Sequence, residues 1–230
     1  MRKAAMMSVL TRSLCPSWIR KGTRLRTHSL ASVLALCTIA PSSALSMEHA
    51  PVRSLLEMRR NNVVIQEWDL SCGAAALATI LNYQHGDPVS EREVAAGLIR
   101  REEYLADPAL VKFRQGFSLL DLKHYVDQRG YSGIGYGELT IEDLIERAPV
   151  MVPVNFNDYN HFVIFRGIWG NRALLADPAF GNRTMLVDKF KDGWLEYPNF
   201  GRVGFVVARH DEVAPPGELA PLPDDFVMLQ

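Results

Sequence analysis

Four side chains stand in an order that could support nucleophilic catalysis by a thiol. Gln66 precedes Cys72 by six residues, and Cys72 opens an apolar run. Far downstream, His161 opens another apolar run and Asp177 closes the one that follows it. A cysteine hydrolase needs a thiol nucleophile, a histidine base, a group that orients the base, and donors for the oxyanion. The four residues together predict a thiol peptidase, and this chemistry calls for no cofactor and no metal.

Cys72 is the candidate nucleophile. The segment Cys72–Tyr83 (CGAAALATILNY) is apolar nearly all round, which is typical of a helix buried in the core. A cysteine at a helix N-terminus and beside a protonated histidine has a lowered pKa, so more of it is thiolate at neutral pH. The alternative is an inert buried cysteine, which is the usual role of a lone thiol.

His161 is the candidate base, and Asp177 is its candidate partner. We expect strands at residues 161–168 and 172–176, joined by a turn at Gly170-Asn171. This hairpin would place His161 nearly opposite Asp177, so that the two side chains meet. Asp177 would accept a hydrogen bond from Nδ1–H, set the tautomer and stabilise the imidazolium. Taken alone, His161 is more readily explained as a structural residue.

Gln66 is the candidate oxyanion donor. Its side-chain amide, together with the backbone N–H of Cys72, could bind the oxygen of a tetrahedral intermediate. Taken alone, Gln66 is equally a polar residue at the end of a short strand, which we expect at residues 62–66. Gly73 would let a substrate approach the backbone closely, although a tight turn explains this glycine as well.

The elements that position these residues are predicted to be helices first and a sheet second. A short charged helix or entry segment is expected at residues 49–62. Capping residues predict three further helices, which begin after Ser90, Ser118 and Thr140. We expect five strands, at residues 150–156, 161–168, 172–176, 183–186 and 203–209. This order predicts an α+β domain whose sheet is built from antiparallel hairpins.

Residues 1–44 are typical of a signal peptide. The first 47 residues hold seven Lys or Arg and no Asp or Glu, and an apolar core follows at Leu30–Ala40. Ser42 and Ala44 are the small residues expected before the cut. Eleven helical residues span about 16 Å, against roughly 30 Å for the apolar core of a bilayer. We therefore expect a periplasmic protein with no stable membrane span after cleavage; an uncleaved signal anchor is the alternative.

Removal of the first 44 of 230 residues leaves 186, which suits one domain. We expect an N-terminal segment at 45–61, a peptidase domain at 62–210, and a Pro-rich, acidic surface tail at 211–230. The whole chain has a net charge of −1, so without the +7 of the first segment it is near −8. No basic stripe remains, which argues against a nucleic-acid partner.

The cysteine count also bears on Cys72. Cys15 and Cys37 both fall in the predicted signal segment, which leaves Cys72 as the only thiol of the exported form. A single cysteine cannot form an intramolecular disulfide, even in an oxidising compartment. This raises the expectation that Cys72 is reactive.

The combined pattern resembles the C39 peptidases, the double-glycine leader peptidases of papain-like fold. The resemblance rests on Gln66-x5-Cys72-Gly73, His161-Phe162-Val163 and Asp177-Pro178-x2-Gly181, and it covers roughly residues 62–209. It implies an N-terminal helical lobe that carries the nucleophile helix and a C-terminal antiparallel sheet. It also implies that Cys72 is the nucleophile, His161 the general base, Asp177 its orienting partner and Gln66 the oxyanion donor.

The resemblance also implies a class of substrate. Family members that cut leaders after Gly-Gly-like pairs are often fused to an ABC exporter, whereas an export signal is predicted here. Stand-alone exported relatives occur beside bacterial surface-fibre secretion systems, including functional-amyloid operons. We therefore expect a protein or peptide substrate such as a fibre subunit or a secretion component, cut after a small residue.

Two alternatives remain at this point. One is a non-catalytic C39-like domain that only grips peptide segments of a secretion partner, and the retained Cys72 argues against it. The other is a peptidoglycan hydrolase of the Cys–His type. The Asp177-Pro178 pair and the spacing of Gln66 from Cys72 favour C39 over that hydrolase.

Overall fold

Six antiparallel strands form the central sheet of the computed structural model, which describes residues 53–113, 116–211, 213–222 and 225–226. These residues belong to one unit, 50–230, and the predicted signal segment 1–44 lies outside them. The strand order across the sheet is β1-β8-β2-β3-β4-β5. The strands are β1 (Tyr131–Tyr136), β2 (Val150–Phe156), β3 (Tyr159–Trp169), β4 (Arg172–Asp177), β5 (Gly181–Leu186) and β8 (Gly204–Arg209).

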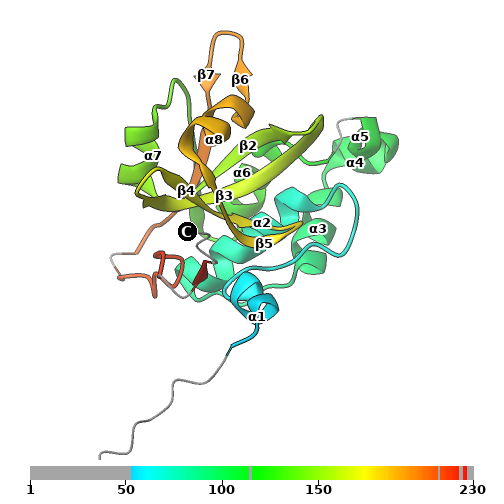
Figure 1. The fold of residues 1–230 in the computed structure, drawn as a ribbon. Coiled ribbons are helices and arrows are strands. Elements are labelled where there is room, and N and C mark those ends of the chain that lie inside the picture. Colours follow the sequence, from blue (N-terminus) through cyan, green and yellow to red (C-terminus); the bar gives the residue numbers. More distant parts are fainter. Residues whose placement is uncertain (1–52, 114–115, 212, 223–224, 227–230) are drawn as a thin grey trace, which may run out of the picture. The chain divides into compact units, whose positions relative to one another are not determined.

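Helices cover both faces of this sheet, as Figure 1 shows. On one face lie α2 (Cys72–Thr79), α3 (Glu91–Ile99) and α6 (Leu119–Gln128). On the other lie α7 (Ile141–Arg147) and α8 (Val187–Gly193). Each face has its own apolar core, because the side chains of a strand alternate between the two faces. The predicted α+β class, with helices before an antiparallel sheet, is confirmed.

The helix that carries the candidate nucleophile is the most buried of these elements. Every residue of α2 is buried, as expected for a run that is apolar all round. The helix continues as a π-helical turn, η1 (Ile80–Gln84), so the predicted helix 72–83 is present but changes its hydrogen bonding after Thr79. Because α2 packs against β3, the N-terminus of α2 lies near the beginning of that strand.

The predicted helix starts are confirmed. The side-chain oxygens of Ser90, Ser118 and Thr140 accept hydrogen bonds from backbone N–H groups three residues later. At Ser118 and Thr140, an aspartate also accepts from the backbone of the capping residue, which completes a capping box. The entry helix α1 (Leu55–Arg60) is shorter than the predicted 49–62 segment.

The predicted strand at residues 62–66 is wrong. This segment is extended, but it has no ladder of its own among the described residues. The N–H of Val64 donates to Thr79 Oγ1 at 2.9 Å, and the N–H of Gln66 donates to the carbonyl oxygen of Pro178 at 2.9 Å. Single bonds to a helix side chain and to a turn therefore replace the strand pairing.

Several short elements were not predicted: α4 (Glu102–Ala106), α5 (Ala109–Phe113), β1, α8, and the hairpin of β6 (Glu196–Tyr197) and β7 (Gly201–Arg202). The glycine content of β1 hides it, yet Gly133 is required there because a Cβ would lie 2.9 Å from Lys123 Cα in α6. Within the ranges that the structure describes, no helix is long and apolar enough to cross a membrane.

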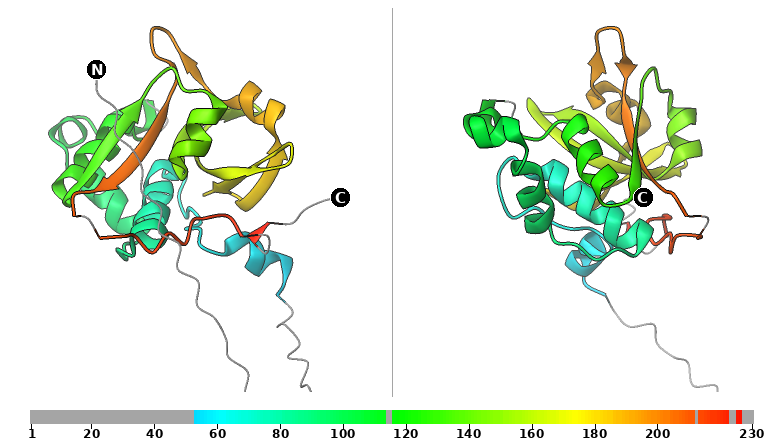
Figure 2. Two further views of the ribbon diagram at one scale, coloured as in Figure 1. Left: turned by 90° about the vertical axis from the view of Figure 1, so that its left-hand side faces the viewer. Right: turned by 180° about the vertical axis from the view of Figure 1, so that it is seen from behind.

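The C-terminal segment is not the surface tail that its composition predicts. Figure 2 shows the chain after β8 running back along the helices toward α1. The N–H groups of Gly217 and Glu218 donate to the carbonyl oxygens of Gln84 and Tyr83. Farther along this segment are three buried side chains, namely Leu219, Asp225 and Phe226. The polar composition hides these anchors because they are few and exposed residues follow Leu219 at 220–222.

Candidate active site

Cys72 is the first residue of α2 and is a buried free thiol. The hydroxyl oxygen of Ser71, which precedes it, lies 2.6 Å from the carbonyl oxygen of Trp68 and within hydrogen-bond distance of Glu91 Oε1, and it makes no capping bond to the helix. The N-terminal N–H groups of α2 therefore carry no side-chain cap. Their partial positive charge is directed at the position of the thiol.

A tight turn begins the strand that carries His161. Asn157 and Asp158 both have positive φ, 56° and 62°, as the two-residue hairpin turn between β2 and β3 requires. The strand that follows includes Tyr159 and His161, two residues apart on one face. His161 opens the apolar part of β3, as predicted, and its ring is buried.

His161 and Asp177 are in direct contact. His161 Nε2 and Asp177 Oδ1 are 2.7 Å apart, and both side chains are 3% exposed. The expectation that Asp177 would meet Nδ1 is therefore wrong: the two residues are diagonal neighbours across the ladder, so the carboxylate reaches the nitrogen farther from the His161 backbone. Within the described part of the chain Nδ1 has no hydrogen-bond partner, and the Cys72 side chain also interacts with the ring of His161.

A β-bulge brings His161 and Asp177 to the same face of the sheet. Past the bulge, Ile168 pairs with Ala173, and this register would continue to place Ile164 opposite Asp177. The register shifts between Phe165 and Gly167, so that Ile164 pairs with Ala176 instead. Val163 and His161 then share a face with Asp177, because a shift of one residue exchanges the two faces of a strand.

The electrostatics of the pair stabilise its charged forms. Burial alone would lower the pKa of His161, but the hydrogen bonds and charges of Asp177 and Cys72 raise it to about 9. Burial opposes ionisation of Asp177, yet the hydrogen bond and charge of His161 hold the pKa of that carboxyl below its usual value. The N–H of Ala179 donates to Asp177 Oδ1 at 2.9 Å, and Arg183 lies 3.2 Å from Oδ2. An imidazolium beside a thiolate is the state that nucleophilic attack by a cysteine needs.

Gln66 lies in the segment that approaches this site from the N-terminal side. Its Nε2 donates to the carbonyl oxygen of Trp68 at 3.2 Å. Its side chain also interacts with Tyr159, whose pKa is raised by burial and by Cys72. The structure thus brings together Cys72, His161 and Asp177 directly, and connects Gln66 to them through Tyr159.

Tyr159 is a site residue that sequence reasoning missed. Its ring centroid lies 5.4 Å from that of His161, at an interplanar angle of 35°. The signal was present, because an aromatic residue two positions before a histidine in a strand must share its face. Tyr159 directly follows the turn residues Asn157 and Asp158, which hid this signal.

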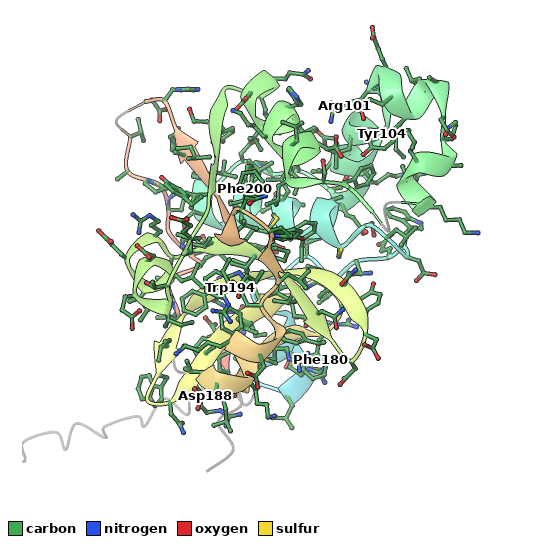
Figure 3. All side chains as sticks on the ribbon, turned by 90° about the horizontal axis from the view of Figure 1, so that it is seen from above. Arg101, Tyr104, Phe180, Asp188, Trp194 and Phe200 are labelled. Atoms are coloured by element: carbon green, nitrogen blue, oxygen red, sulfur yellow. The ribbon has the colours of Figure 1, made fainter. Side chains whose placement is uncertain are left out.

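A cleft of about 860 Å³ opens from the thiol and the histidine. Its wall is mostly apolar and includes Phe117, Leu120, Tyr136, Pro153, Phe162, Leu195, Tyr197 and Phe200. The β6–β7 hairpin supplies Tyr197 and Phe200, and Figure 3 shows Phe200 at this hairpin, far from Phe180. Among the residues that the structure describes, no group of three or more His, Cys, Asp or Glu side chains could hold a metal ion.

Comparison with known proteins supports this reading of the fold. The chain is 38% identical over 145 residues to the probable functional amyloid protease FapD of Pseudomonas aeruginosa, and 39% identical over 145 residues to that of Pseudomonas fluorescens. Each match covers 62% of this chain and 61% of the relative, so the chain matches less than two thirds of either relative's length.

Solved structures give the same answer for the fold. A double glycine motif protease from an AMS/PCAT transporter, solved in complex with its leader peptide, matches with a TM-score of 0.50 and 25% identity over 64% of this chain and 90% of that one. The peptidase domain of Streptococcus ComA matches with a TM-score of 0.51 and 17% identity over 66% of this chain and 100% of that one. The model of the Peptidase C39 family matches residues 60–198. The chain therefore belongs to the C39 family of cysteine peptidases.

Proposed function

We propose that this protein is an exported cysteine endopeptidase that cleaves after a small residue in a secreted or fibre-associated protein. The observation that carries the proposal is the contact between His161 and Asp177 at the N-terminus of α2, where Cys72 opens into an apolar cleft. A thiol, a buried imidazole with a raised pKa and an adjoining cleft are the parts that covalent peptide hydrolysis requires.

The reaction follows from this geometry. His161 Nδ1 takes the proton of Cys72, and the thiolate attacks the carbonyl carbon of the scissile bond. The imidazolium returns a proton to the leaving amine, which departs and leaves a thioester on Cys72. Water, deprotonated by His161, then hydrolyses the thioester and restores the thiol. Asp177 holds the ring throughout and stabilises its positive charge.

The oxyanion of each tetrahedral intermediate is stabilised by two donors in this proposal. One is the backbone N–H of Cys72 at the uncapped start of α2, and the other is the side-chain amide of Gln66. That amide donates to the carbonyl oxygen of Trp68 at 3.2 Å, a long bond that a substrate oxygen can replace. The donor then contributes most when negative charge develops on the substrate oxygen, so it stabilises the transition state more than the bound substrate.

Preference for a small residue before the bond rests on the packing around the thiol. Gly73 and Ala74 follow Cys72, and a Cβ at Gly73 would lie 3.4 Å from Phe162 of β3. A larger substrate side chain here would displace packed groups, and overpacking typically costs about 1–3 kcal/mol. The longer apolar cleft suits side chains farther from the cut.

The choice of substrate class rests on the relatives and on the predicted export segment. Two relatives are named as probable functional amyloid proteases, and a similar solved structure is a complex with a leader peptide. Residues 1–44 are expected to direct the chain to the periplasm. A fibre subunit or secretion component in that compartment fits both considerations.

The test is cleavage of a peptide library by protein purified after export in a bacterial host, read by mass spectrometry. We expect cuts after Gly or Ala with the wild type and none with Cys72→Ala. Cuts after Phe, Leu or Arg would contradict the specificity. Digestion of muropeptides without peptide cleavage would assign the protein to cell-wall hydrolysis, and peptide binding without any cleavage would make it a binding domain.

A further inference from the structure

Arg166 is a fully buried charge that the proposed reaction does not use. It is the extra residue of the bulge in β3, and its side chain is 0% exposed. Burial lowers the pKa of the guanidinium, and the charge and hydrogen bond of Asp225 oppose this. A buried cation is costly unless it is paired and fully hydrogen-bonded, so an arginine here is expected to be tied to a specific structural need.

The partners of Arg166 come mainly from the C-terminal segment. Nη2 lies 2.7 Å from Asp225 Oδ2, in an ion pair whose carboxylate is 1% exposed. Nε donates to the carbonyl oxygen of Leu219 at 2.9 Å, and Nη2 also donates to that of Ala220 at 3.2 Å. All three partners lie beyond residue 198, where the match to the family model ends.

The remaining bond of Arg166 leads toward Asp177. Nη1 donates to Asn182 Oδ1 at 2.8 Å, and Asn182 lies opposite Ala176 in the β4–β5 ladder, beside the pair of Asp177 and Gly181. Asn182 Nδ2 donates to the carbonyl oxygen of Asn61 at 2.7 Å. Asn61 in turn donates to Asp225 Oδ1 at 2.6 Å, which closes the network.

The backbone at this point depends on the same residues. Gly167 follows Arg166 with φ of 154°, a conformation that favours glycine, and the register of β3 against β4 changes here. A bulge leaves its extra residue unpaired in the ladder. The side-chain hydrogen bonds of Arg166 to Asn182 and to the C-terminal segment hold the strand in place where the ladder bonds are lost.

We propose that Arg166, clamped by Asp225 and Leu219 of the C-terminal segment, is a positioning residue that holds the bulge and so keeps Asp177 on the face of His161. The inference rests on the proposed function, because it assigns Arg166 an effect through the His161–Asp177 pair. It also makes the C-terminal residues 217–222 and 225–226 a working part of the peptidase.

The test compares Arg166→Met with Asp177→Asn and with a matched control, Arg172→Met. Arg172 of β4, like Arg166 of β3, donates to a side chain of β5, through a 2.8 Å bond from Nε to Thr184 Oγ1, but at the far end of the β4–β5 hairpin. The readout is the pH dependence of kcat/KM, with each enzyme normalised to its content of alkylatable Cys72. The groups that face His161 are Cys72, Tyr159 and Asp177, with Arg183 behind the last; Arg166→Met changes none of these.

For Arg166→Met we expect kcat/KM to fall by about 10- to 100-fold, which is roughly what a misplaced catalytic group costs. The fall should be in kcat, with KM nearly unchanged. The alkaline limb should move to lower pH, as in Asp177→Asn, and the double variant should lie no lower than Asp177→Asn alone. Arg172→Met should keep the wild-type profile. A lower melting temperature together with an unchanged pH profile of kcat/KM would overturn the proposal, because a purely structural role for Arg166 predicts that result.

Two variants keep the test decisive if Arg166→Met does not fold. Asp225→Asn keeps the shape of the carboxylate and removes its charge, and Arg166→Lys keeps the charge and loses the fork of donors. Both should shift the alkaline limb in the same direction by a smaller amount. If Asp177→Asn shifts the profile and neither of these does, the clamp is overturned while the proposed function stands. If Asp177→Asn itself leaves the profile unchanged, the role of Asp177 fails and the clamp fails with it.

Discussion

His161 and Asp177 share a face of the sheet because β3 holds one more residue than the ladder to β4 can pair. The extra residue is Arg166, and if it were paired with β4 instead of bulged, Asp177 would lie opposite Ile164, on the face that packs against α2. With the bulge, the carboxylate oxygen meets His161 Nε2 at 2.7 Å. The His161–Asp177 contact is therefore a consequence of strand register as much as of residue identity.

Cys72→Ala should abolish peptide cleavage and labelling by iodoacetamide. The thiol is the proposed nucleophile, and its loss removes only a small group at the start of a helix, so far-UV circular dichroism should be unchanged. Ser71→Ala changes the neighbouring side chain and retains the thiol, so it should still label. Labelling of Cys72→Ala would place reactivity at another cysteine.

Activity should fall on the alkaline side near pH 9, where His161 loses its proton. The pKa of His161 is raised to about 9 because Asp177 and Cys72 outweigh the effect of burial. Removing the Asp177 charge takes away part of that stabilisation, so the alkaline limb of Asp177→Asn should lie at lower pH than that of the wild type. A rate profile of each enzyme from pH 5 to 10 measures this.

His161→Ala should cost more activity than Asp177→Asn. The first removes the base itself, whereas the second leaves a base whose orientation and charge are less well supported. Single-turnover rates with the same peptide separate the two. Near-normal rates for His161→Ala would mean that the base has been wrongly assigned.

Gln66→Ala should slow kcat by roughly 10²–10³-fold with little change in KM, the scale of losing one oxyanion donor. Gln66→Glu is the matched variant, because it keeps the size of the side chain and removes the donor. It should be as slow as Gln66→Ala. A change confined to KM would assign Gln66 to substrate binding instead.

Local patterns predicted the helices and the main strands because each has its own signal. The caps at Ser118 and Thr140 and the apolar run after Cys72 depend on neighbours in sequence, and all three are found as predicted. The hairpin at Gly170-Asn171 predicted that His161 and Asp177 lie close together, but their shared face depends on the bulge at Arg166, which has no local signal. Here the sequence was informative about position but not about which ring nitrogen is used.

What could not be predicted depends on contacts between distant segments. The bulge at Arg166 is specified by bonds to residues such as Leu219 and Asp225, more than 50 positions away. A polar, Pro-rich composition gives no sign that a few of its side chains are buried. The cleft likewise combines α6, β1, β3 and the β6–β7 hairpin, and no local pattern joins these.

Phe200→Ala should raise KM by about 5- to 30-fold, equivalent to about 1–2 kcal/mol, with kcat nearly unchanged. The side chain is 65% exposed at the β6–β7 hairpin and lines the cleft that leads to Cys72, so little folding energy depends on it and substrate contact is its main available role. Its backbone carbonyl accepts a 2.7 Å bond from the N–H of Glu138, which the alanine variant keeps. Trp169→Ala is the matched control, because Trp169 is an aromatic of similar exposure, 57%, at the end of β3 and outside the cleft. The measurement is steady-state kinetics with a long peptide and with a version shortened upstream of the cut. With the shortened peptide, wild type and Phe200→Ala should have the same KM, because this peptide lacks the part that would contact Phe200. An equal rise in KM for Trp169→Ala, or a fall in kcat alone for Phe200→Ala, would show that this hairpin does not bind substrate.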